Sequence, residues 1–334
     1  MKGLMVRTIV LGTAIMALAL FISVIPTFAQ YPERPVQILV GYPAGGPADL
    51  SARAMAEAAK PFFPKPFAVV NKPGGSGVLA TNELIHSAPD GYTLGHVSIS
   101  HMCWAPHLAE LPYKGPQDVQ FIISCVTAQE ALTVRADSPW KTFKELLEYA
   151  KANPGKVRIG NAGLGTTTHF DALSMKLAGI TQFTEVPFAG AAPAVTAILG
   201  GHIEAVSLNT SPVHPHVKAG KLRYLALFAE ERNTDVPELK DVPTFKELGY
   251  NVITVGTPYY IAAPKGTPRE VVDMLHDALL KGEKSDFFKD FCKNNLLVAE
   301  MKGPAQLAKE AEKNFAFYRD FIEKMNIRSM MQNK

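Results

Sequence analysis

Two glycine-rich segments of the sequence place backbone N–H groups and hydroxyl side chains where they could hold an anion. The first, at 41–49, reads GYPAGGPAD, and the second, at 160–169, reads GNAGLGTTTH. Each follows an apolar stretch and precedes a helical one, so free N–H groups and the positive end of a helix dipole would face a ligand. Neither segment contains Lys or Arg. Binding of a polyphosphate usually requires such a cationic side chain, whereas neutral hydrogen-bond donors can hold a carboxylate. The alternative is that the glycines only form tight turns and that Thr166 or Thr167 only caps its helix.

The residues that could carry catalysis form no complete set. The sequence has no G-x-S-x-G for a serine nucleophile, no G-x-x-x-x-G-K-[ST] for a nucleotide and no dinucleotide-binding G-x-G-x-x-G at its first helix. His169 stands about one helical turn after Thr166, which could bring an imidazole to a hydroxyl. An exported hydrolase or transferase using His169 and a Thr hydroxyl is therefore one reading. In the other, His169 supports the loop or donates to a ligand.

No metal and no cofactor are expected. His214 and His216 flank Pro215, which splays the two rings, and no third ligand stands near them. The three cysteines, at 103, 125 and 292, have no paired spacing for zinc. They are also too few for a disulfide scaffold, although an oxidising compartment could still join two of them.

The elements that must position the two loops alternate between strand and helix. An apolar run at 36–42 (VQILVGY) predicts a strand buried on both faces. Capping boxes at Thr142–Glu145 and Thr244–Glu247 predict two helix starts. Further strands are predicted at 67–70, 94–99, 157–159, 206–208, 222–228 and 259–262, and the last helix at 304–325. This alternation predicts an α/β fold of parallel sheets covered by helices on both faces.

Composition limits the class of protein. A chain of 334 residues suggests two domains, and 47% hydrophobic with 19% charged residues describes a globular protein. The formal net charge of +3 is too small for a nucleic-acid binder, which would show a basic stripe.

The first residues read as an export signal. Lys2 and Arg7 form a positive region, an uncharged run extends from Thr8 to Ile25, and a small-residue pattern ends at Ala29. We expect cleavage after Ala29, a signal peptide at 1–29 and a periplasmic mature chain. The alternative is an uncleaved anchor helix.

The whole mature chain resembles the substrate-binding proteins of tripartite tricarboxylate transporters, also called the Bug family. The resemblance begins at YPERP (31–35) and continues through an ordered series of blocks. These are GYPAGGPAD (41–49), NKPGGSG (71–77), APDGYTL (88–94), KANPGKVRIGNAGLGTTTH (151–169), VPFAGAAPA (186–194), KAGKLRYLA (218–226), DVPTFKELG (241–249) and APKGTP (263–268).

The resemblance implies a two-lobed periplasmic binding protein of the type II kind, each lobe a mixed sheet flanked by helices, with crossing strands as the hinge. Lobe one is expected at 30–126 and 252–334 and lobe two at 127–251, because apolar stretches at 122–126 and 252–261 would serve as the crossing strands. The resemblance also implies a monomeric receptor that is not an enzyme. It would capture a small organic carboxylate and deliver it to integral-membrane transporter subunits, with no nucleic acid among its partners. A receptor for a signalling system is the alternative.

By the same resemblance, ligand binding falls on both glycine loops, which pinch one carboxylate, partly through water. The residues concerned are Tyr42, Ala44, Gly45, Ala48 and Asp49 in the first loop, Gly163, Thr166, Thr167 and His169 in the second, and Phe188 and Asn209 beyond them. Asp49 stands at a helix start, so we expect it to hold the loop or a bridging water instead of touching the ligand carboxylate.

The ligand is expected to have an apolar or aromatic body. Tyr42, Trp104 and Phe188 would give the pocket apolar walls beside its polar end. A tricarboxylate such as citrate would leave charges facing those walls, and burying an unpaired carboxylate is costly. The segment 100–106 (SHMCWAP) departs from the more polar stretch often found in the family. It either faces the cleft, with Trp104 as a wall, or forms a packed turn.

Overall fold

The structure, a computed structural model, describes residues 31–332 except 233 and 235. The predicted signal peptide at 1–29 lies outside these residues. Among them, no helix is both long enough and apolar enough to cross a membrane.

The first of two sheets has six strands in the order β11-β4-β10-β3-β1-β2. Its parallel part is formed by β1 (Val36–Val40), β2 (Phe67–Asn71) and β3 (Thr93–Ser98). β10 (Thr257–Pro264) pairs antiparallel with β3 and with β4 (Val119–Ala128), and the short β11 (Leu297–Val298) pairs antiparallel with β4. The apolar run predicted as a buried strand is β1, whose Ile38, Leu39 and Val40 are almost completely buried.

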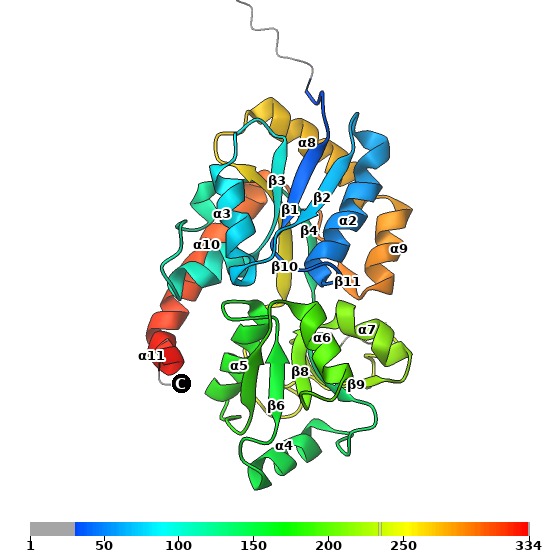
Figure 1. Ribbon diagram of the computed structural model, residues 1–334, viewed down its shortest axis with the longest axis vertical. Coiled ribbons are helices and arrows are strands. Elements are labelled where there is room, and N and C mark those ends of the chain that lie inside the picture. The colour runs from blue at the N-terminus through cyan, green and yellow to red at the C-terminus, as the bar shows by residue number, and fades with distance from the viewer. Residues whose placement is uncertain (1–30, 233, 235, 333–334) are drawn as a thin grey trace, which may run out of the picture. The chain divides into compact units, whose positions relative to one another are not determined.

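Helices cover both faces of this sheet (Figure 1). α2 (Pro47–Ala59), α8 (Arg269–Glu283) and α9 (Asp286–Asn294) lie on one side, and α3 (Val78–His86) and α10 (Pro304–Lys324) on the other. The last helix of the described residues is the short α11 (Ile327–Gln332). The helix predicted at 304–325 is therefore confirmed, and its Leu307, Ala311 and Ile322 are buried in the core.

The second sheet has five strands in the order β7-β6-β8-β5-β9. They are β5 (Glu130–Arg135), β6 (Arg158–Asn161), β7 (Thr184–Pro187), β8 (Ala205–Asn209) and β9 (Leu222–Phe228). α4 (Phe143–Ala152) and α5 (Thr167–Leu177) pack in the core of one face, and α6 (Ala191–Leu199) and α7 (Thr210–Lys218) in that of the other. Successive residues of β5 alternate between these cores, as Ala131 and Leu132 show.

The structure corrects two predictions about the elements. The parallel sheets predicted from the alternation of strand and helix are wrong, and the mixed sheets implied by the resemblance are confirmed, because β10 and β5 run antiparallel to their neighbours. The box at Thr142–Glu145 begins α4, but the one at Thr244–Glu247 begins only a turn. The two hydrogen bonds of the capping box form between Thr244 and Glu247. Gly249 nevertheless takes a left-handed conformation (φ 85°) and Tyr250 N donates back to Phe245 O, so the chain leaves the helical conformation after one turn.

Trp104 forms part of a packed turn and not of a cleft wall. The segment Ser100–Trp104 is one turn of π-helix, and the Trp104 side chain is 1% exposed. Its ring meets Phe170 of α5 edge-on at 5.1 Å and Tyr318 of α10 at 5.4 Å. The aromatic contact therefore joins elements that flank different sheets. The cysteines at 103, 125 and 292 are all buried and unpaired.

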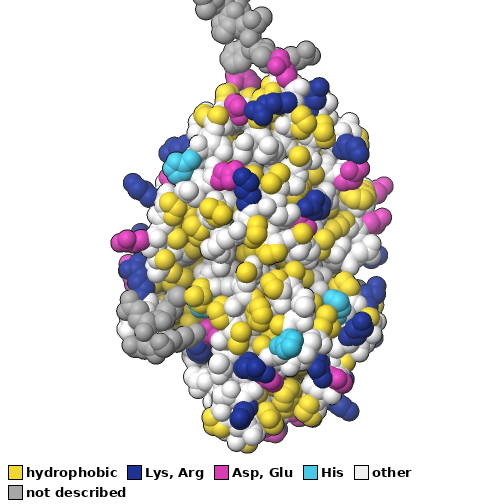
Figure 2. All heavy atoms as spheres, in the orientation of Figure 1, with side chains coloured by type: hydrophobic (Ala, Val, Ile, Leu, Met, Phe, Trp, Pro, Cys, Tyr) yellow, Lys and Arg dark blue, Asp and Glu magenta, His cyan; other side chains and the backbone are white. Residues whose placement is uncertain are grey.

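Charged side chains of both signs are interspersed on the surface. Figure 2 shows Lys, Arg, Asp and Glu scattered over the face drawn there, without a large area of one sign. This distribution agrees with the small net charge of +3.

Candidate functional site

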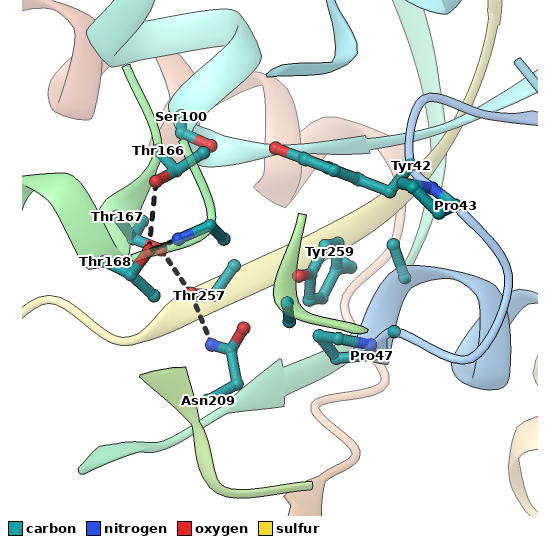
Figure 3. A pocket seen from close by; sticks show the side chains of 14 residues that line it. Tyr42, Pro43, Pro47, Ser100, Thr166, Thr167, Thr168, Asn209, Thr257 and Tyr259 are labelled. Atoms are coloured by element: carbon teal, nitrogen blue, oxygen red, sulfur yellow. Dashed lines mark hydrogen bonds between the residues drawn. The ribbon is translucent and has the colours of Figure 1, made fainter. Parts of the chain in front are cut away.

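The two glycine loops meet at one cavity, which lies among elements of both sheets (Figure 3). Its volume is about 20 Å³, enough for about one water molecule. None of the lining residues is charged. They are Tyr42, Pro43, Gly46, Pro47, Ala48, Ser100, Ala162, Thr166, Thr167, Thr168, Ala191, Asn209, Thr257 and Tyr259.

Asp49 holds the first loop from behind. Its Oδ2 accepts from Gly45 N at 3.0 Å, and its Oδ1 accepts from Arg53 Nε at 2.8 Å and Asn71 Nδ2 at 2.9 Å. Burial opposes its charge, yet the hydrogen bonds from Arg53, Gly45 and Asn71 hold the pKa of this carboxyl below its usual value. Asp49 is not among the residues that line the cavity. Its carboxylate thus ties the loop to α2 and β2.

Tyr42 reaches the cavity with an oriented hydroxyl. Its Oη lies 3.0 Å from His101 Nε2, which also lies 2.9 Å from Ser76 O. His101 Nδ1 accepts from Ser98 N at 3.3 Å, so the proton of the neutral ring sits on Nε2 and is donated to Tyr42 and Ser76. Burial lowers the pKa of His101 to about 4, which keeps the ring neutral. The Tyr42 proton is therefore left for Ser100 or a ligand.

Two glycines permit the close approach behind Tyr42. A Cβ at Gly41 would lie 2.6 Å from Gly77 Cα, and one at Gly77 would lie 2.1 Å from His101 Nε2. Gly77 also has a φ of 100°, which a larger side chain rarely adopts. The block NKPGGSG thus serves the site by letting the turn at 75–77 pack against the first loop and His101.

The second loop is held by its own hydroxyl groups. Thr166 caps α5, because its Oγ1 accepts from His169 N at 3.2 Å while donating to Gly163 O at 2.6 Å. Thr168 Oγ1 accepts from Ala162 N at 2.9 Å and lies 3.0 Å from Thr166 Oγ1. His169 Nδ1 accepts from Gly165 N at 3.2 Å, and its Nε2 lies 3.8 Å from Glu185. The His169 ring thus supports the loop from outside the cavity.

Three helices begin at the cavity. Ala48 lies in the first turn of α2, Thr167 and Thr168 in that of α5, and Ala191 in that of α6. First-turn N–H groups have no partner within their helix. Those of Ala48, Thr167 and Thr168 make no other backbone hydrogen bond in the described part of the chain. The helix dipoles add a positive potential, so the cavity suits an anion although no cationic side chain lines it.

The cavity wall opposite the loops comes from strand ends. Asn209 ends β8, and Thr257 and Tyr259 belong to β10. Thr257 Oγ1 lies 2.5 Å from Thr167 Oγ1, although the two residues are 90 positions apart. Asn209 Nδ2 donates to the same Thr257 oxygen at 2.9 Å.

The structure brings some of the predicted site residues together at the cavity. Tyr42, Ala48, Thr166, Thr167 and Asn209 line it. Gly163 and Phe188 instead line an adjoining apolar groove of about 450 Å³, together with Ser76, Val78, Leu108 and Leu164. Ala44 and Gly45 are exposed on the outer side of their loop. Asp49 and His169 stand behind the walls that they support.

Four further residues line the cavity that were not predicted from the sequence as ligand-binding residues: Ser100, Ala191, Thr257 and Tyr259. Ala191 begins a helix after Gly190, which is the same signal that marked the first two loops, so it could have been found. Thr257 and Tyr259 lie on a strand predicted only from 259, and no local motif marks them.

A two-lobed α/β fold whose sheets share a polar, uncharged cavity at helix N-termini is that of a periplasmic solute-binding protein. The chain belongs to one family of such receptors. Residues 51–327 match the family described as tripartite tricarboxylate transporter family receptor. The resemblance found in the sequence is thereby confirmed.

Individual relatives agree with this assignment. The chain is 37% identical over 273 residues to the "UPF0065 protein in gbd 5'region" of Cupriavidus necator, covering 81% of this chain and 82% of the relative. It is 30% identical to the periplasmic binding protein BugD, with a TM-score of 0.82 and coverage of 88% and 98%. MatC from Rhodopseudomonas palustris, solved with bound malate, is 26% identical, with a TM-score of 0.81 and coverage of 87% and 99%. Of these two solved relatives, one is a periplasmic binding protein and the other holds malate.

Proposed function

We propose that this chain is a periplasmic receptor that captures a small organic carboxylate in the cavity and delivers it to membrane subunits of a tripartite tricarboxylate-type transporter. The observation that carries the proposal is the convergence of three helix N-termini on a cavity lined without Lys or Arg. The free N–H groups of Ala48, Thr167 and Thr168 are its donors for the carboxylate. The malate bound by MatC is a ligand of this chemical class.

The ligand enters by separation of the two lobes. A cavity of about 20 Å³ is too small for an organic acid, and its walls belong to elements of both sheets. We place lobe one at 30–126 and 252–334 and lobe two at 127–251. In support, every strand from β5 to β9 is in the second sheet, and β4 and β10 flank that stretch of chain. Rotation about these crossing segments would open and close the cavity.

The ligand's body is proposed to be apolar. The groove beside the second loop is lined by Val78, Leu108, Leu164 and Phe188 and offers no charged side chain. A carboxylate held at the helix N-termini would therefore have apolar surface near its other end, which favours an apolar or aromatic body over further charges.

The chain is proposed to leave its ligand unchanged. The alternative, a hydrolase using His169 and a Thr hydroxyl, needs the imidazole to accept a hydroxyl proton. His169 Nδ1 instead accepts from Gly165 N, and the Thr166 hydroxyl donates to Gly163 O. We also propose that the chain is exported with cleavage after Ala29 and that the mature protein is a monomer.

Isothermal titration of the mature chain against aliphatic, aromatic and tricarboxylic acids tests this function. We expect one acid to bind stoichiometrically, with acids of apolar body ahead of citrate, and to be recovered unchanged. Failure of every acid to bind, or conversion of the bound acid, would contradict the proposal. Tight binding of citrate alone would contradict its ligand ordering.

A further inference from the structure

A buried acceptor stands behind the inner wall of the cavity. Glu130, the first residue of β5, is completely buried, and its Oε1 accepts from Thr257 Oγ1 at 2.5 Å. Thr257 in turn contacts Thr167 Oγ1 at 2.5 Å and Asn209 Nδ2 at 2.9 Å (Figure 3). A continuous hydrogen-bonded chain therefore runs from the cavity surface to Glu130.

Glu130 forms a carboxylic acid–carboxylate pair with Asp171 of α5. Asp171 is also completely buried and hydrogen-bonds to Glu130. Burial raises the pKa of both carboxyls, and the neighbouring charge of Glu130 raises that of Asp171 further, well above its usual value, so Asp171 keeps the shared proton. No Lys or Arg forms an ion pair with either carboxyl within the described residues. With the shared proton between the two carboxyls, Glu130 Oε1 remains an acceptor.

The direction of the remaining bonds follows from counting protons. A hydroxyl has one proton to donate. Thr257 gives its proton to Glu130, so its oxygen must accept from both Thr167 and the Asn209 amide. Thr167 thereby gives its own proton inward, to Thr257. At the cavity, Thr167 Oγ1 and Asn209 Oδ1 are left as acceptors.

The neighbouring hydroxyls are engaged in the same way. The Thr166 proton goes to Gly163 O at 2.6 Å. Since Thr166 Oγ1 has no second proton, Thr168 must donate in its contact of 3.0 Å with Thr166. The carboxylate therefore has the backbone N–H groups of the α5 first turn to accept from, and the hydroxyl of Thr167 cannot serve it.

We infer that the ligand carries an O–H or N–H donor on the carbon next to its bound carboxylate, directed at Thr167 Oγ1 and Asn209 Oδ1. The inference rests on the proposed function and narrows its ligand to 2-hydroxy or 2-amino acids. The donor must be close to the carboxylate because the N–H and the Oγ1 that serve them belong to one residue, Thr167. An acid without the donor would leave buried acceptors unpaired, which is costly. Glu130 is a positioning residue that acts through Thr257.

Matched pairs of acids test the inference by isothermal titration of the mature chain. The pairs are lactate and propionate, malate and succinate, and mandelate and phenylacetate, with alanine, aspartate and phenylglycine as the amino counterparts. We expect the donor-bearing member of any pair that binds to bind roughly 10-fold tighter or more. Comparing the affinities of the 2-hydroxy and 2-amino acids shows whether the ligand's donor is an O–H or an N–H group.

The outcomes separate this inference from the function on which it rests. If acids bind and those without a donor bind equally well or better, the inference is overturned and the receptor function stands. If no acid binds, the receptor function fails and the inference fails with it.

Two neighbouring substitutions locate the effect. Thr167→Val keeps the side-chain volume but removes the acceptor, so donor-bearing acids should weaken roughly 10-fold while their partners change little. Thr168→Val disturbs only the hydroxyl that holds the loop, so both members of a pair should weaken alike and the preference should remain. An equal loss for both members in Thr167→Val would show that its hydroxyl serves the carboxylate, which overturns the inference. Thermal unfolding of both variants checks that they fold.

Discussion

At the scale of residues, the site relies on side chains that fix the direction of other donors. Asp49 orients the first loop through Gly45, and His101 orients the Tyr42 hydroxyl through its neutral tautomer. Asp49 could be anticipated from the sequence, because a carboxylate in the first turn of a helix has a defined use. The role of His101 could not, since its partners Ser76 and Tyr42 are 25 and 59 positions away.

Replacing Asp49 with Ala should weaken ligand binding by about 1–3 kcal/mol, because three donors lose their charged acceptor and the loop loosens. Asp49→Asn keeps one acceptor oxygen and should retain part of the affinity. Titration of both variants with an acid that the unmodified protein binds measures the effect. Unchanged affinity in a folded Asp49→Ala protein would argue against the role.

At the scale of elements, the loops were predictable and the opposite wall was not. Glycines after an apolar strand and before a helix are a local signal, and both loops lie where that signal placed them. Thr257 and Asn209 complete the cavity only because β10 begins and β8 ends beside α5. Such neighbours depend on strand order, which one-dimensional periodicity does not specify. The turn at 244–249 failed as a helix because Gly249 ends it after one turn.

His101 is buried where β3, the turn at 75–77 and the first loop pack together. This burial predicts that the free energy of unfolding depends on pH. The folded protein binds a proton at His101 only below about pH 4, whereas the unfolded chain does so below about 6.5. Stability is therefore complete above the higher value and falls as the pH drops through this window, by about 1.4 kcal/mol per pH unit for one proton. His96, whose pKa burial lowers to about 3, acts in the same sense.

Urea unfolding across this pH window compares the unmodified protein with His101→Asn. The free energy of unfolding of the variant should fall less steeply, by about 1.4 kcal/mol per pH unit, because one titrating group is absent. Opposing contributions from Glu130 and Asp171 are common to both proteins and cancel in the difference. Parallel slopes would mean that His101 is not held neutral in the folded chain.

At the scale of the whole molecule, the fold joins its two sheets through a small cavity and an aromatic contact. Trp104, Tyr318 and Phe321 meet Phe170 of α5, whose N-terminus faces the cavity. The two-lobed arrangement came from the resemblance of ordered blocks and not from periodicity, which predicted parallel sheets. The antiparallel strands β10 and β5 make the two sheets mixed, and they supply Thr257, Tyr259 and Glu130 to the site region.

One pair of variants tests most directly that the helix N-termini hold a carboxylate. Ala48 and Ala305 each follow the proline that begins a helix after a glycine N-cap, but Ala48 is buried at the cavity and Ala305 is exposed on α10. Ala48→Asp sets a negative charge among the proposed donors, whereas Ala305→Asp makes the same change at the same helix position elsewhere. Isothermal titration with the acid that the unmodified protein binds should show binding lost in the first variant and kept in the second. Retained affinity in a folded Ala48→Asp protein would contradict the account.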